Sequence, residues 1–366
     1  MKTVAVYFGG KSPEHDISVI TGVLTLNSLR KTDYEVIPVF IDKNGEWFTG
    51  ELLFDLDNYK NLDYKKLKKV VLKPSDKTLY YDKNGKLKRI VSISSALNCC
   101  HGGDGENGNL SGLIELSNIA LCSPGALSSA LFMDKVKTKN ALKGIGVKTL
   151  PAIVKNSSTI TQKELEDYEY PLIVKPNFLG SSVGIRKVND YEHLLSAISY
   201  ALKFSNEVLI EPCLIDFIEI NCAVYRNSKG DIVVSECERP VASEDILSFS
   251  DKYKNGKREF PANIPKKTSD KIKEIAEKVY CSYIERGVIR IDFFVVGEKV
   301  LVNEVNTVPG SLAYYLFSDT LKDFSKMLEE IIALGEREYI KKSSLQFEYK
   351  SGILTSFGAK GAKRLR

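Results

Sequence analysis

The chain is predicted to be an α/β protein of several domains, on the evidence of its length and its first segment. It has 366 residues, and at roughly 100–200 residues per domain two or three domains are expected. Residues 4–8 form a short apolar run that ends at Gly9-Gly10, residues 17–29 have helical apolar spacing, and residues 34–41 form a second apolar run. A strand, a helix and a strand in this order predict a βαβ unit.

The composition is that of an ordinary globular protein and gives no support to a nucleic-acid or membrane partner. Lys and Arg number 52 against 47 Asp and Glu, a net charge of only +5. No apolar stretch approaches the roughly 20 residues that span a bilayer, and the first apolar run is too short for a signal sequence. Seven scattered Cys and three His argue against a disulfide framework and a His-rich zinc site, so a cytoplasmic location is expected.

The other elements follow from turn signals and periodicity. Asp-Lys-Asn-Gly occurs at 42–45 and at 82–85 and predicts two hairpin turns, and the first domain is expected to close near Pro124-Gly125. A helix is predicted over 128–143, ended by Gly144 and Gly146. Further predictions are a helix at 269–286, helical structure to about 334, and strands at 170–176, 207–212, 218–225, 232–238, 288–296 and 299–305.

Two segments are predicted to lack regular structure. Residues 243–265 are polar and punctuated by Pro, and a loop that long inside a compact domain is usually a lid or a binding loop. The basic end of the chain, from Lys360 onward, is interpreted as a frayed terminus rather than a nucleic-acid arm.

The predicted strands at 288–296 and 299–305 carry a concentration of charge. Side chains alternate along a strand, so Arg290 and Asp292 share a face of their strand, and Glu304 and Asn306 likewise share a face of theirs. If the strands pair, an Arg, two carboxylates and an amide converge, and such oxygen ligands suit Mg²⁺. The alternative is a solvated hairpin face with cross-strand charge pairs. The turn that follows, Thr307-Val308-Pro309-Gly310, could present a backbone N–H to a developing anion.

Three glycine-rich loops follow predicted strands. The segment from Lys175 to Gly184 is a strand followed by a Gly/Ser loop; it suits phosphate oxygens but is no Walker A motif, and a plain hairpin is the alternative. In the loop at 101–108, His101 is either a catalytic group or a structural residue. In the loop at 9–16, Glu14 and Asp16 either face a ligand or cap a helix.

Six motifs, taken in order along the chain, resemble those of the D-alanine–D-alanine ligases of the ATP-grasp superfamily. The resemblance runs from residue 1 to about residue 318. Each motif is weak alone, whereas six in the family's order are a specific signal. The motifs are Gly9-Gly10-x-Ser12-x-Glu14-His15-x-Ile17-Ser18, His101-Gly-x-x-Gly105-Glu106-Asn107-Gly108, Met133-Asp134-Lys135, Val174-Lys175-Pro176 with Gly180-Ser181-Ser182-Val183-Gly184, Arg290-Ile291-Asp292, and Asn303-Glu304-Val305-Asn306-Thr307-x-Pro309-Gly310.

The resemblance implies a three-part ATP-grasp architecture. An N-terminal Rossmann-like substrate domain would span 1–125, a small central ATP-grasp domain 126–212, and a C-terminal ATP-grasp domain 213–345, with its lid loop at about 243–265. Residues 346–366 would form a basic tail. ATP would lie between the last two domains, the amino acids would bind where all three meet, and family members suggest a homodimer.

The resemblance also implies a reaction. ATP phosphorylates the carboxylate of a first D-alanine, and the amine of a second amino acid attacks the acyl phosphate. Arg290 and the N–H of Gly310 would stabilise the oxyanion. Glu14 would bind the ammonium of the first D-alanine, with His101 at its carboxylate, and Tyr253 would join Ser181 and Glu14 in a network that locks the lid.

The nucleotide and its metal ions take further residues in this resemblance. Asp292, Glu304 and Asn306 would hold two Mg²⁺, with Mn²⁺ as a substitute. The adenine hinge would be Glu211 to Leu214, and Glu219 would bind the ribose. Phosphate contacts would come from Lys135, Lys175, Gly180, Ser181, Ser182 and Lys252.

The second substrate is where the sequence departs from the family pattern. Tyr315 stands where a small hydroxyl residue usually holds the carboxylate of the second amino acid, and Leu316 would form an apolar wall for a methyl group. The Lys252-Tyr253 pair resembles loops that accept an amine nucleophile. D-Serine or another amino acid therefore stays open beside D-alanine.

Two readings from other classes compete with a ligase. A regulatory ATP-binding module without catalysis would not need an oxyanion donor such as Arg290. A nicotinamide dehydrogenase would use the initial βαβ unit, but Gly9-Gly10 lacks the G-x-G-x-x-G pattern.

Overall fold

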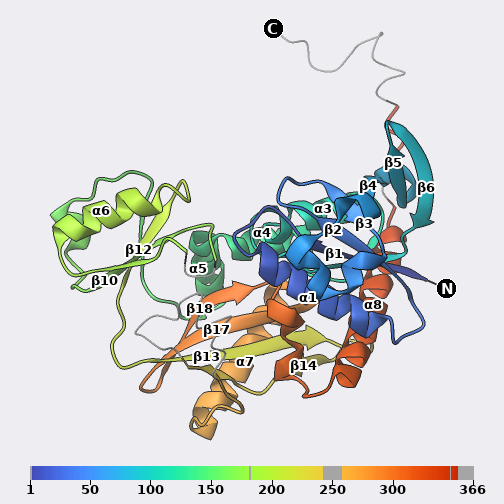
Figure 1. The fold of residues 1–366 in the computed structure, drawn as a ribbon. Coiled ribbons are helices and arrows are strands. Elements are labelled where there is room, and N and C mark those ends of the chain that lie inside the picture. The colour runs from blue at the N-terminus through green and yellow to red at the C-terminus, as the bar shows by residue number, and fades with distance from the viewer. Residues whose placement is uncertain (1, 181–182, 242–257, 347, 353–366) are drawn as a thin grey trace.

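An eight-stranded sheet, two four-stranded sheets and a two-stranded ribbon organise the computed structural model (Figure 1). The structure describes residues 2–180, 183–241, 258–346 and 348–352. In Figure 1 the large N-terminal sheet lies at one side, a small sheet covered by a helix lies at the other, and the third sheet runs beneath and between them. The predicted α/β class is confirmed.

The N-terminal sheet begins with the predicted βαβ unit. Strand β1 (Thr3–Gly9) is buried along its whole length, which explains its apolar run; α1 (His15–Leu29) follows, and β2 (Glu35–Ile41) pairs parallel to β1. The strand order is β6-β5-β4-β3-β2-β1-β7-β8. The added strands are β3 (Trp47–Thr49), β4 (Lys68–Lys73), β5 (Thr78–Lys83), β6 (Lys86–Ser92), β7 (Ser95–Asn98) and β8 (Ala120–Leu121).

Both predicted hairpin turns are confirmed. The turn at 42–45 joins β2 to the antiparallel β3, and the turn at 82–85 joins β5 to β6. Strands β7 and β8 run parallel to β1, so the loop after β7 opens at the same edge of the sheet as the loop after β1. The short helices α2 (Gly103–Glu106) and α3 (Asn109–Leu116) follow that loop.

The central sheet is antiparallel and has the order β11-β10-β12-β9. It is the small sheet of Figure 1, and helix α6 (Tyr191–Ala201) packs on it through a core that includes Leu194 and Ile198. Its strands are β9 (Ile153–Lys155), β10 (Leu172–Pro176), β11 (Arg186–Val188) and β12 (Val208–Pro212). The predicted strands at 170–176 and 207–212 are thus confirmed.

The third sheet has the order β14-β13-β17-β18. Its strands are β13 (Ile218–Arg226), β14 (Ile232–Val234), β17 (Val288–Val296) and β18 (Lys299–Asn306). The strand predicted over 232–238 is too long, because the chain leaves β14 at Val234 and then forms the ribbon of β15 (Arg239–Pro240) with β16 (Arg258–Glu259).

Three helix predictions need correction. The helix predicted over 128–143 is two helices, α4 (Ala126–Met133) and α5 (Lys135–Gly144), because Asp134 is extended between them and its carboxylate caps α5 by accepting from Lys137 N at 3.0 Å. Helix α7 spans Lys266–Tyr283, three residues earlier than predicted. The last helix, α8 (Leu321–Ser343), runs past residue 334.

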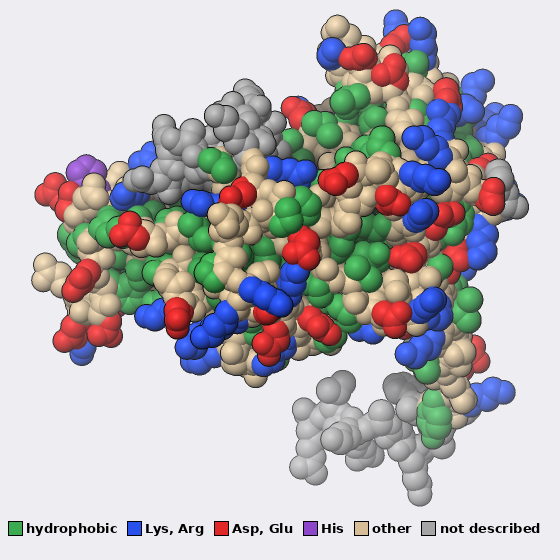
Figure 2. Space-filling model, turned by 90° about the horizontal axis from the view of Figure 1, so that it is seen from below, with side chains coloured by type: hydrophobic (Ala, Val, Ile, Leu, Met, Phe, Trp, Pro, Cys, Tyr) green, Lys and Arg blue, Asp and Glu red, His purple; other side chains and the backbone are tan. Residues whose placement is uncertain are grey.

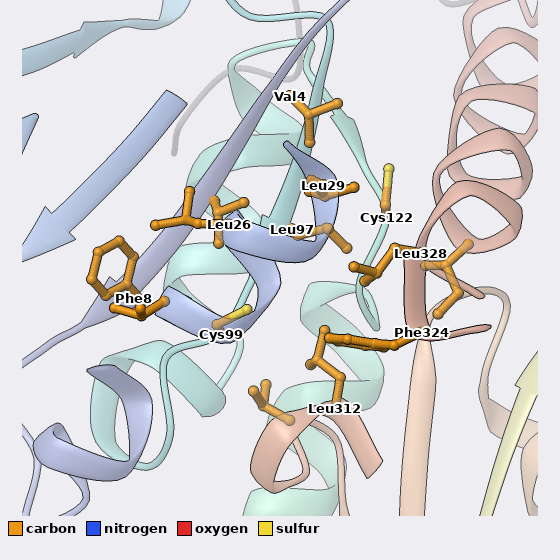
Figure 3. Close-up of a cluster of buried hydrophobic side chains, with 14 of the residues drawn as sticks. Val4, Phe8, Leu26, Leu29, Leu97, Cys99, Cys122, Leu312, Phe324 and Leu328 are labelled. Atoms are coloured by element: carbon orange, nitrogen blue, oxygen red, sulfur yellow. The ribbon is translucent and has the colours of Figure 1, made fainter. Parts of the chain in front are cut away.

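One buried cluster joins the two ends of the chain (Figure 3). Side chains from β1 and α1 meet side chains from α8 and from the 3₁₀ segment η7 (Gly310–Leu316). The cluster also includes residues of β13 and β17, so it packs the third sheet against the N-terminal part of the molecule. Labelled members in Figure 3 are Val4, Phe8, Leu26, Leu29, Leu97, Cys99, Cys122, Leu312, Phe324 and Leu328.

The surface charges and the cysteines are as the composition predicts: charges of both signs are mixed (Figure 2), and the thiols are not paired in disulfides. Figure 2 shows acidic and basic side chains interspersed on one face of the molecule. Among the helices that the structure describes, none combines the length and the apolar character that crossing a membrane requires. All seven Cys are free thiols, and the adjacent Cys99 and Cys100 are buried as predicted.

Candidate functional site

The charged strand pair forms as the sequence predicts. Strands β17 and β18 pair antiparallel, with Asp292 opposite Glu304 and Arg290 opposite Asn306, so all four side chains share one face. The register shifts after Asp292, which leaves Asn303 as an extra residue on β18. Alternation along each strand predicted the two pairs, but this bulge turns Glu304 and Asn306 to the face that carries Arg290 and Asp292.

These groups are mostly withdrawn from water, which contradicts a solvated hairpin face. The side chains of Arg290 and Asp292 are 16% and 8% exposed. Arg290 donates to Asp292 through Nε at 2.7 Å and Nη2 at 2.9 Å, and Asn306 Nδ2 donates to Asp292 Oδ2 at 3.1 Å. Charge-assisted bonds of this kind fix the carboxylate in one orientation.

Strand β13 extends the same face. Asn221 pairs with Asp292 and Glu219 lies two residues away, so Glu219 and Asp292 point to the same side of the sheet. Leu214, in the segment between β12 and β13, is half-buried.

A buried ion-pair group lies on the central sheet. Glu211, 2% exposed, has Lys175 Nζ at 2.7 Å from Oε2 and Lys139 Nζ at 2.7 Å from Oε1. Lys175 Nζ also lies 3.5 Å from Asn303 Oδ1, which connects the central sheet to β18. Sequence reasoning missed Lys139, although its spacing of four from Lys135 in a predicted helix places both on one face.

The predicted phosphate loop meets the N-terminal part of the molecule. Lys135 Nζ donates to the carbonyl of Leu179 at 2.7 Å, and burial lowers the pKa of Lys135 although Glu304 opposes that shift. A Cβ on Gly180 would lie 3.1 Å from Glu14 Oε2, so the loop backbone runs close to this carboxylate. The predicted residues Ser181, Ser182, Lys252 and Tyr253 lie outside the described residues, as does most of the 243–265 loop.

Glu14 does not cap helix α1. It occupies the N-cap position, but its side chain makes no capping hydrogen bond, and Asp16 is exposed with Lys43 Nζ 3.5 Å away. The Glu14 carboxylate instead lies against Gly102, where an added Cβ would stand 2.6 Å from Oε2. The capping interpretation of Glu14 is therefore wrong, and its carboxylate faces the loop after β7.

His101 is buried and neutral. Its Nε2 lies 3.0 Å from Thr21 Oγ1, and burial, aided by the positive charge of Arg290, lowers the pKa of His101 to about 3. Thr21 Oγ1 in turn accepts from Ser311 N at 2.9 Å. These contacts favour the structural interpretation of His101 over an acid–base role.

Glu106 is a site residue that sequence reasoning did not select. Its Oε2 accepts from Gly102 N at 3.0 Å and its Oε1 from Val308 N at 3.1 Å. Burial first, and then the negative charge of Glu14, raises the pKa of Glu106 to about 7. The residue stood in a quoted motif, but its partner Val308 is 202 residues away and no local pattern reveals it.

The segment after Pro309 brings Tyr315 to Arg290. Burial raises the pKa of Tyr315, while Arg290 acts to lower it by its charge and by a hydrogen bond. The guanidinium of Arg258 lies 5.0 Å from the centre of the Tyr315 ring. Leu316 is 1% exposed and belongs to the core cluster of Figure 3, so its side chain is packed inside the protein.

One cavity collects groups from the N-terminal, central and C-terminal parts of the described chain. Among the described residues, those predicted from the sequence that line it are Glu14, Lys135, Gly180, Arg290, Glu304 and Asn306. Glu106, Phe132, Met133, Leu179 and Val305 complete its wall. Of the other described candidates, those that do not line it are His101, Lys175, Glu211, Leu214, Glu219, Asp292, Gly310, Tyr315 and Leu316.

Family comparisons agree with this geometry. The family model of the D-ala D-ala ligase N-terminus matches residues 3–124, and that of the C-terminus matches residues 144–333. A D-alanine–D-alanine ligase of Thermosipho melanesiensis is 36% identical over 362 residues, which cover 95% of this chain and 97% of the relative. One of Helicobacter pylori is 34% identical over 335 residues, 88% of this chain and 93% of the relative.

Solved structures of ligases are also similar to this chain. The crystal structure of D-alanine–D-alanine ligase from Helicobacter pylori has a TM-score of 0.74 at 30% identity and covers 92% of this chain and 98% of its own. The VanG D-Ala:D-Ser ligase of Enterococcus faecalis has a TM-score of 0.79 at 29% identity, with 91% and 99% covered. The chain therefore belongs to the D-alanine–D-alanine ligase family of ATP-grasp enzymes.

Proposed function

We propose that this chain is an ATP-dependent ligase that joins two D-alanines into the D-alanyl-D-alanine used for peptidoglycan. The observation that carries the proposal is the cavity in which Glu14, Lys135 and Arg290 meet, because it combines a carboxylate for an ammonium with cations for phosphate and for an oxyanion. Identity above 30% over nearly the whole chain supports the same reaction. ATP and D-alanine are cytoplasmic metabolites in such a reaction, and we place the enzyme there.

The chain's own cations are suited to hold the nucleotide. Lys135 reaches the backbone of the Gly180 loop, and Lys175 stands beside it on β10. We assign phosphate contacts to both, to Gly180 and to Ser181, Ser182 and Lys252. The segment from Glu211 to Leu214 would hold the adenine, and Glu219 the ribose. Phosphoryl transfer needs positioning and charge neutralisation more than covalent chemistry from the protein.

The donor set on β17 and β18 fits Mg²⁺. Asp292 and Glu304 stand opposite each other, and the side-chain amide nitrogen of Asn306 donates to Asp292 Oδ2 at 3.1 Å. Two carboxylates and an amide, all of which carry hard oxygen ligands, therefore lie at one place. Two ions held by Asp292, Glu304 and Asn306 would neutralise phosphate charge when bound. Mn²⁺ accepts the same ligands and would substitute.

The remaining residues bind the amino acids and stabilise the reacting centre. Glu14 holds the ammonium of the first D-alanine and His101 lies behind that site as a neutral group. The ammonium of the second amino acid first loses a proton to water, and the resulting amine attacks the carbonyl carbon of the acyl phosphate. The C=O electron pair then moves to the carbonyl oxygen as negative charge. Arg290 and the N–H of Gly310 stabilise that oxyanion, and release of phosphate completes the amide bond. Ser181 and Tyr253 would join Glu14 in closing the lid.

Tyr315 marks the second-substrate site in this proposal. Its hydrogen bond with Arg290 supports this assignment, because Arg290 is the residue proposed to stabilise the oxyanion, and the Tyr315 hydroxyl would bind the carboxylate of the second amino acid. Leu316, packed in the core, would support this wall from behind. D-Serine is the alternative second substrate, because a D-Ala:D-Ser ligase is among the similar structures.

The domain limits and the assembly are also proposals. We propose the divisions 1–125, 126–212 and 213–345, a basic tail at 346–366, and a homodimer. Analytical ultracentrifugation at several concentrations tests the dimer: a single species at the mass of one chain would contradict it.

Phosphate release by the purified chain tests the function. With ATP, Mg²⁺ and D-alanine alone, we expect phosphate and D-alanyl-D-alanine in equal amounts. Release that requires D-serine or another amino acid beside D-alanine would favour the alternative ligase. In a regulatory module Arg290→Ala would leave ATP binding and function intact, whereas a ligase should lose about 3 kcal/mol of transition-state stabilisation. Arg290→Lys, which keeps the charge, should lose less.

A further inference from the structure

The turn that carries Gly310 has an unusual backbone. Ser311, Leu312 and Ala313 have φ values of 51°, 49° and 53°, so three consecutive residues with side chains are left-handed. Each such residue costs roughly 1–2 kcal/mol relative to a right-handed conformation. A conformation of this kind persists where the surrounding structure holds it in place, and it often marks a functional segment.

Two hydrogen bonds from the N-terminal part hold this turn, one on each side of Gly310. On one side Val308 N donates to Glu106 Oε1 at 3.1 Å. On the other side Ser311 N donates to Thr21 Oγ1 at 2.9 Å. Both acceptors come from segments 202 and 290 residues away, so the turn is tethered to α1 and to α2 rather than to its own sheet.

The two acceptors are themselves fixed by the loop after β7. Glu106 Oε2 accepts from Gly102 N at 3.0 Å, and Thr21 Oγ1 lies 3.0 Å from His101 Nε2. Thr21 is fully buried, so its hydroxyl has little freedom to exchange its partner for water. The loop at 101–106 thus connects the two tethers to each other and passes beside Glu14.

The Cα of Gly310 faces open space and is not packed against other residues of the described chain. The φ of Gly310 is not positive, and a Cβ built on it would meet no heavy atom within 4 Å among the described residues. Neither backbone conformation nor internal packing therefore requires glycine there. An open side next to a donor N–H suits a site that a substrate must approach closely.

Resting on the ligase function proposed above, we propose that Glu106 and Thr21 are positioning residues that clamp the 307–313 turn from both sides and so aim the Gly310 N–H at the reacting carbonyl. The clamp makes oxyanion stabilisation depend on the N-terminal part, whose loop also faces the first amino acid. Glu106 lines the cavity and Thr21 does not, and the role proposed for both is exerted through the backbone of the turn.

Glu106→Gln and Thr21→Val remove the tethers with little change of shape. A Gln amide has one oxygen, so it can accept from Gly102 N or from Val308 N but cannot accept from both. Val has no hydroxyl to accept from Ser311 N. Matched controls are Asp104→Asn, in the same short helix, and Thr25→Val, one turn further along α1 and equally buried. Thr21→Ser keeps the hydroxyl and should restore the tether.

Amide hydrogen exchange of the full-length chain tests the clamp without any assay of the reaction. A peptide covering 307–313 should exchange at least tenfold faster in Glu106→Gln and in Thr21→Val, and at the wild-type rate in both controls and in Thr21→Ser. Unchanged exchange in both tether variants would overturn the clamp, whatever their activity. If the peptide responds while the wild-type chain forms no dipeptide, the clamp stands and the proposed reaction is wrong.

Kinetics then test what the clamp does. In both tether variants kcat should fall at least tenfold while the KM for ATP stays within twofold. Affinity for a phosphinate dipeptide mimic of the tetrahedral state should fall by a factor similar to kcat, since the lost interaction belongs to that state. Equal losses of ATP affinity and kcat, together with a large fall in Tm, would show general damage and contradict a positioning role.

Discussion

Arg290 and Asp292 form one unit on strand β17, joined by hydrogen bonds of 2.7 Å and 2.9 Å. Arg290 is assigned to the oxyanion and Asp292 to Mg²⁺, so the two functions depend on side chains that hold each other in place. Because Asn306 also donates to Asp292, at 3.1 Å, the metal ligands and the oxyanion donor are connected within a single network. Removing one member should therefore disturb the others.

Asp292→Asn should weaken both Mg²⁺ binding and catalysis. The amide keeps the shape but loses the charge that binds Mg²⁺ and orients Arg290. We expect at least tenfold more Mg²⁺ for half-maximal activity and a kcat lowered at least tenfold. Titration of activity with MgCl₂ measures both, with the exposed Asp231→Asn as control. Wild-type Mg²⁺ dependence in Asp292→Asn would contradict the ligand assignment.

Lys139→Met should destabilise the protein. Among the described residues, Lys175 then remains as the cation close to the buried Glu211 carboxylate. Breaking a buried pair costs about 3–5 kcal/mol when no partner is left, so about 2 kcal/mol is expected here. Burial acts to raise the pKa of Glu211, but Lys175 and Lys139 outweigh it and lower that pKa.

The sign of the pH effect follows from that lowered pKa. The ion pairs stabilise the fold above the pKa of the unfolded carboxyl, and this contribution is lost as the pH falls through the pKa of the folded state. Urea unfolding at pH 7, with the exposed Lys143→Met as control, measures the loss of stability in Lys139→Met. Repeating it at lower pH should show a smaller difference from the wild type. A loss no larger than in that control would show that Lys139 contributes little to stability.

His101 should make the fold sensitive to mild acid. Its pKa of about 3 in the folded protein lies below the ordinary value near 6.5, so between these values the unfolded chain binds a proton that the folded chain refuses. Stability should fall by roughly 1.4 kcal/mol for each pH unit below 6.5 on account of this residue. Unfolding of His101→Gln between pH 4.5 and 6.5 should show a shallower slope than wild type. His193→Gln, at an exposed position, is the control, and equal slopes in all three proteins would contradict the prediction.

Gly310→Ala should abolish activity without unfolding the protein. The added methyl group meets no atom of the described chain, so Tm should change by less than about 2 °C. It would occupy the space proposed for the substrate, and kcat/KM for D-alanine should fall at least a hundredfold. Gly144→Ala, also with open space around its Cβ and no positive φ, should keep full activity. Normal activity of Gly310→Ala would contradict the assignment of Gly310 to the oxyanion site.

Local patterns predicted the parts of the site that lie close together in the sequence. Alternation predicted two same-face pairs, Arg290 with Asp292 and Glu304 with Asn306. The bulge at Asn303, which brings both pairs to one face, was not predicted. The first βαβ unit followed from the burial of β1, which gives an uninterrupted apolar run. No strand range was predicted for β4 or β6, although a hairpin turn was predicted before β6. The many Lys residues of both strands hide the apolar alternation that marks a strand.

Long-range contacts could not be predicted in this way. The break at Asp134 depends on one capping side chain inside a segment of helical character. The bonds from Glu106 to Val308 and from Thr21 to Ser311 depend on how distant parts of the chain pack, and so does the left-handed turn that they hold. The resemblance to a family named the reaction, whereas the contacts that position its donors came from the three-dimensional arrangement.

Transfer of oxygen from D-alanine to phosphate tests the central claim most directly. The chain would be incubated with ATP, Mg²⁺ and D-alanine labelled with ¹⁸O in its carboxylate, and the released phosphate analysed by mass spectrometry. In an acyl phosphate mechanism one carboxylate oxygen bridges to phosphorus and leaves with it. We predict one ¹⁸O in each phosphate released and one D-alanyl-D-alanine formed for each ATP consumed. Phosphate without the label, or no dipeptide from D-alanine alone, would contradict the account.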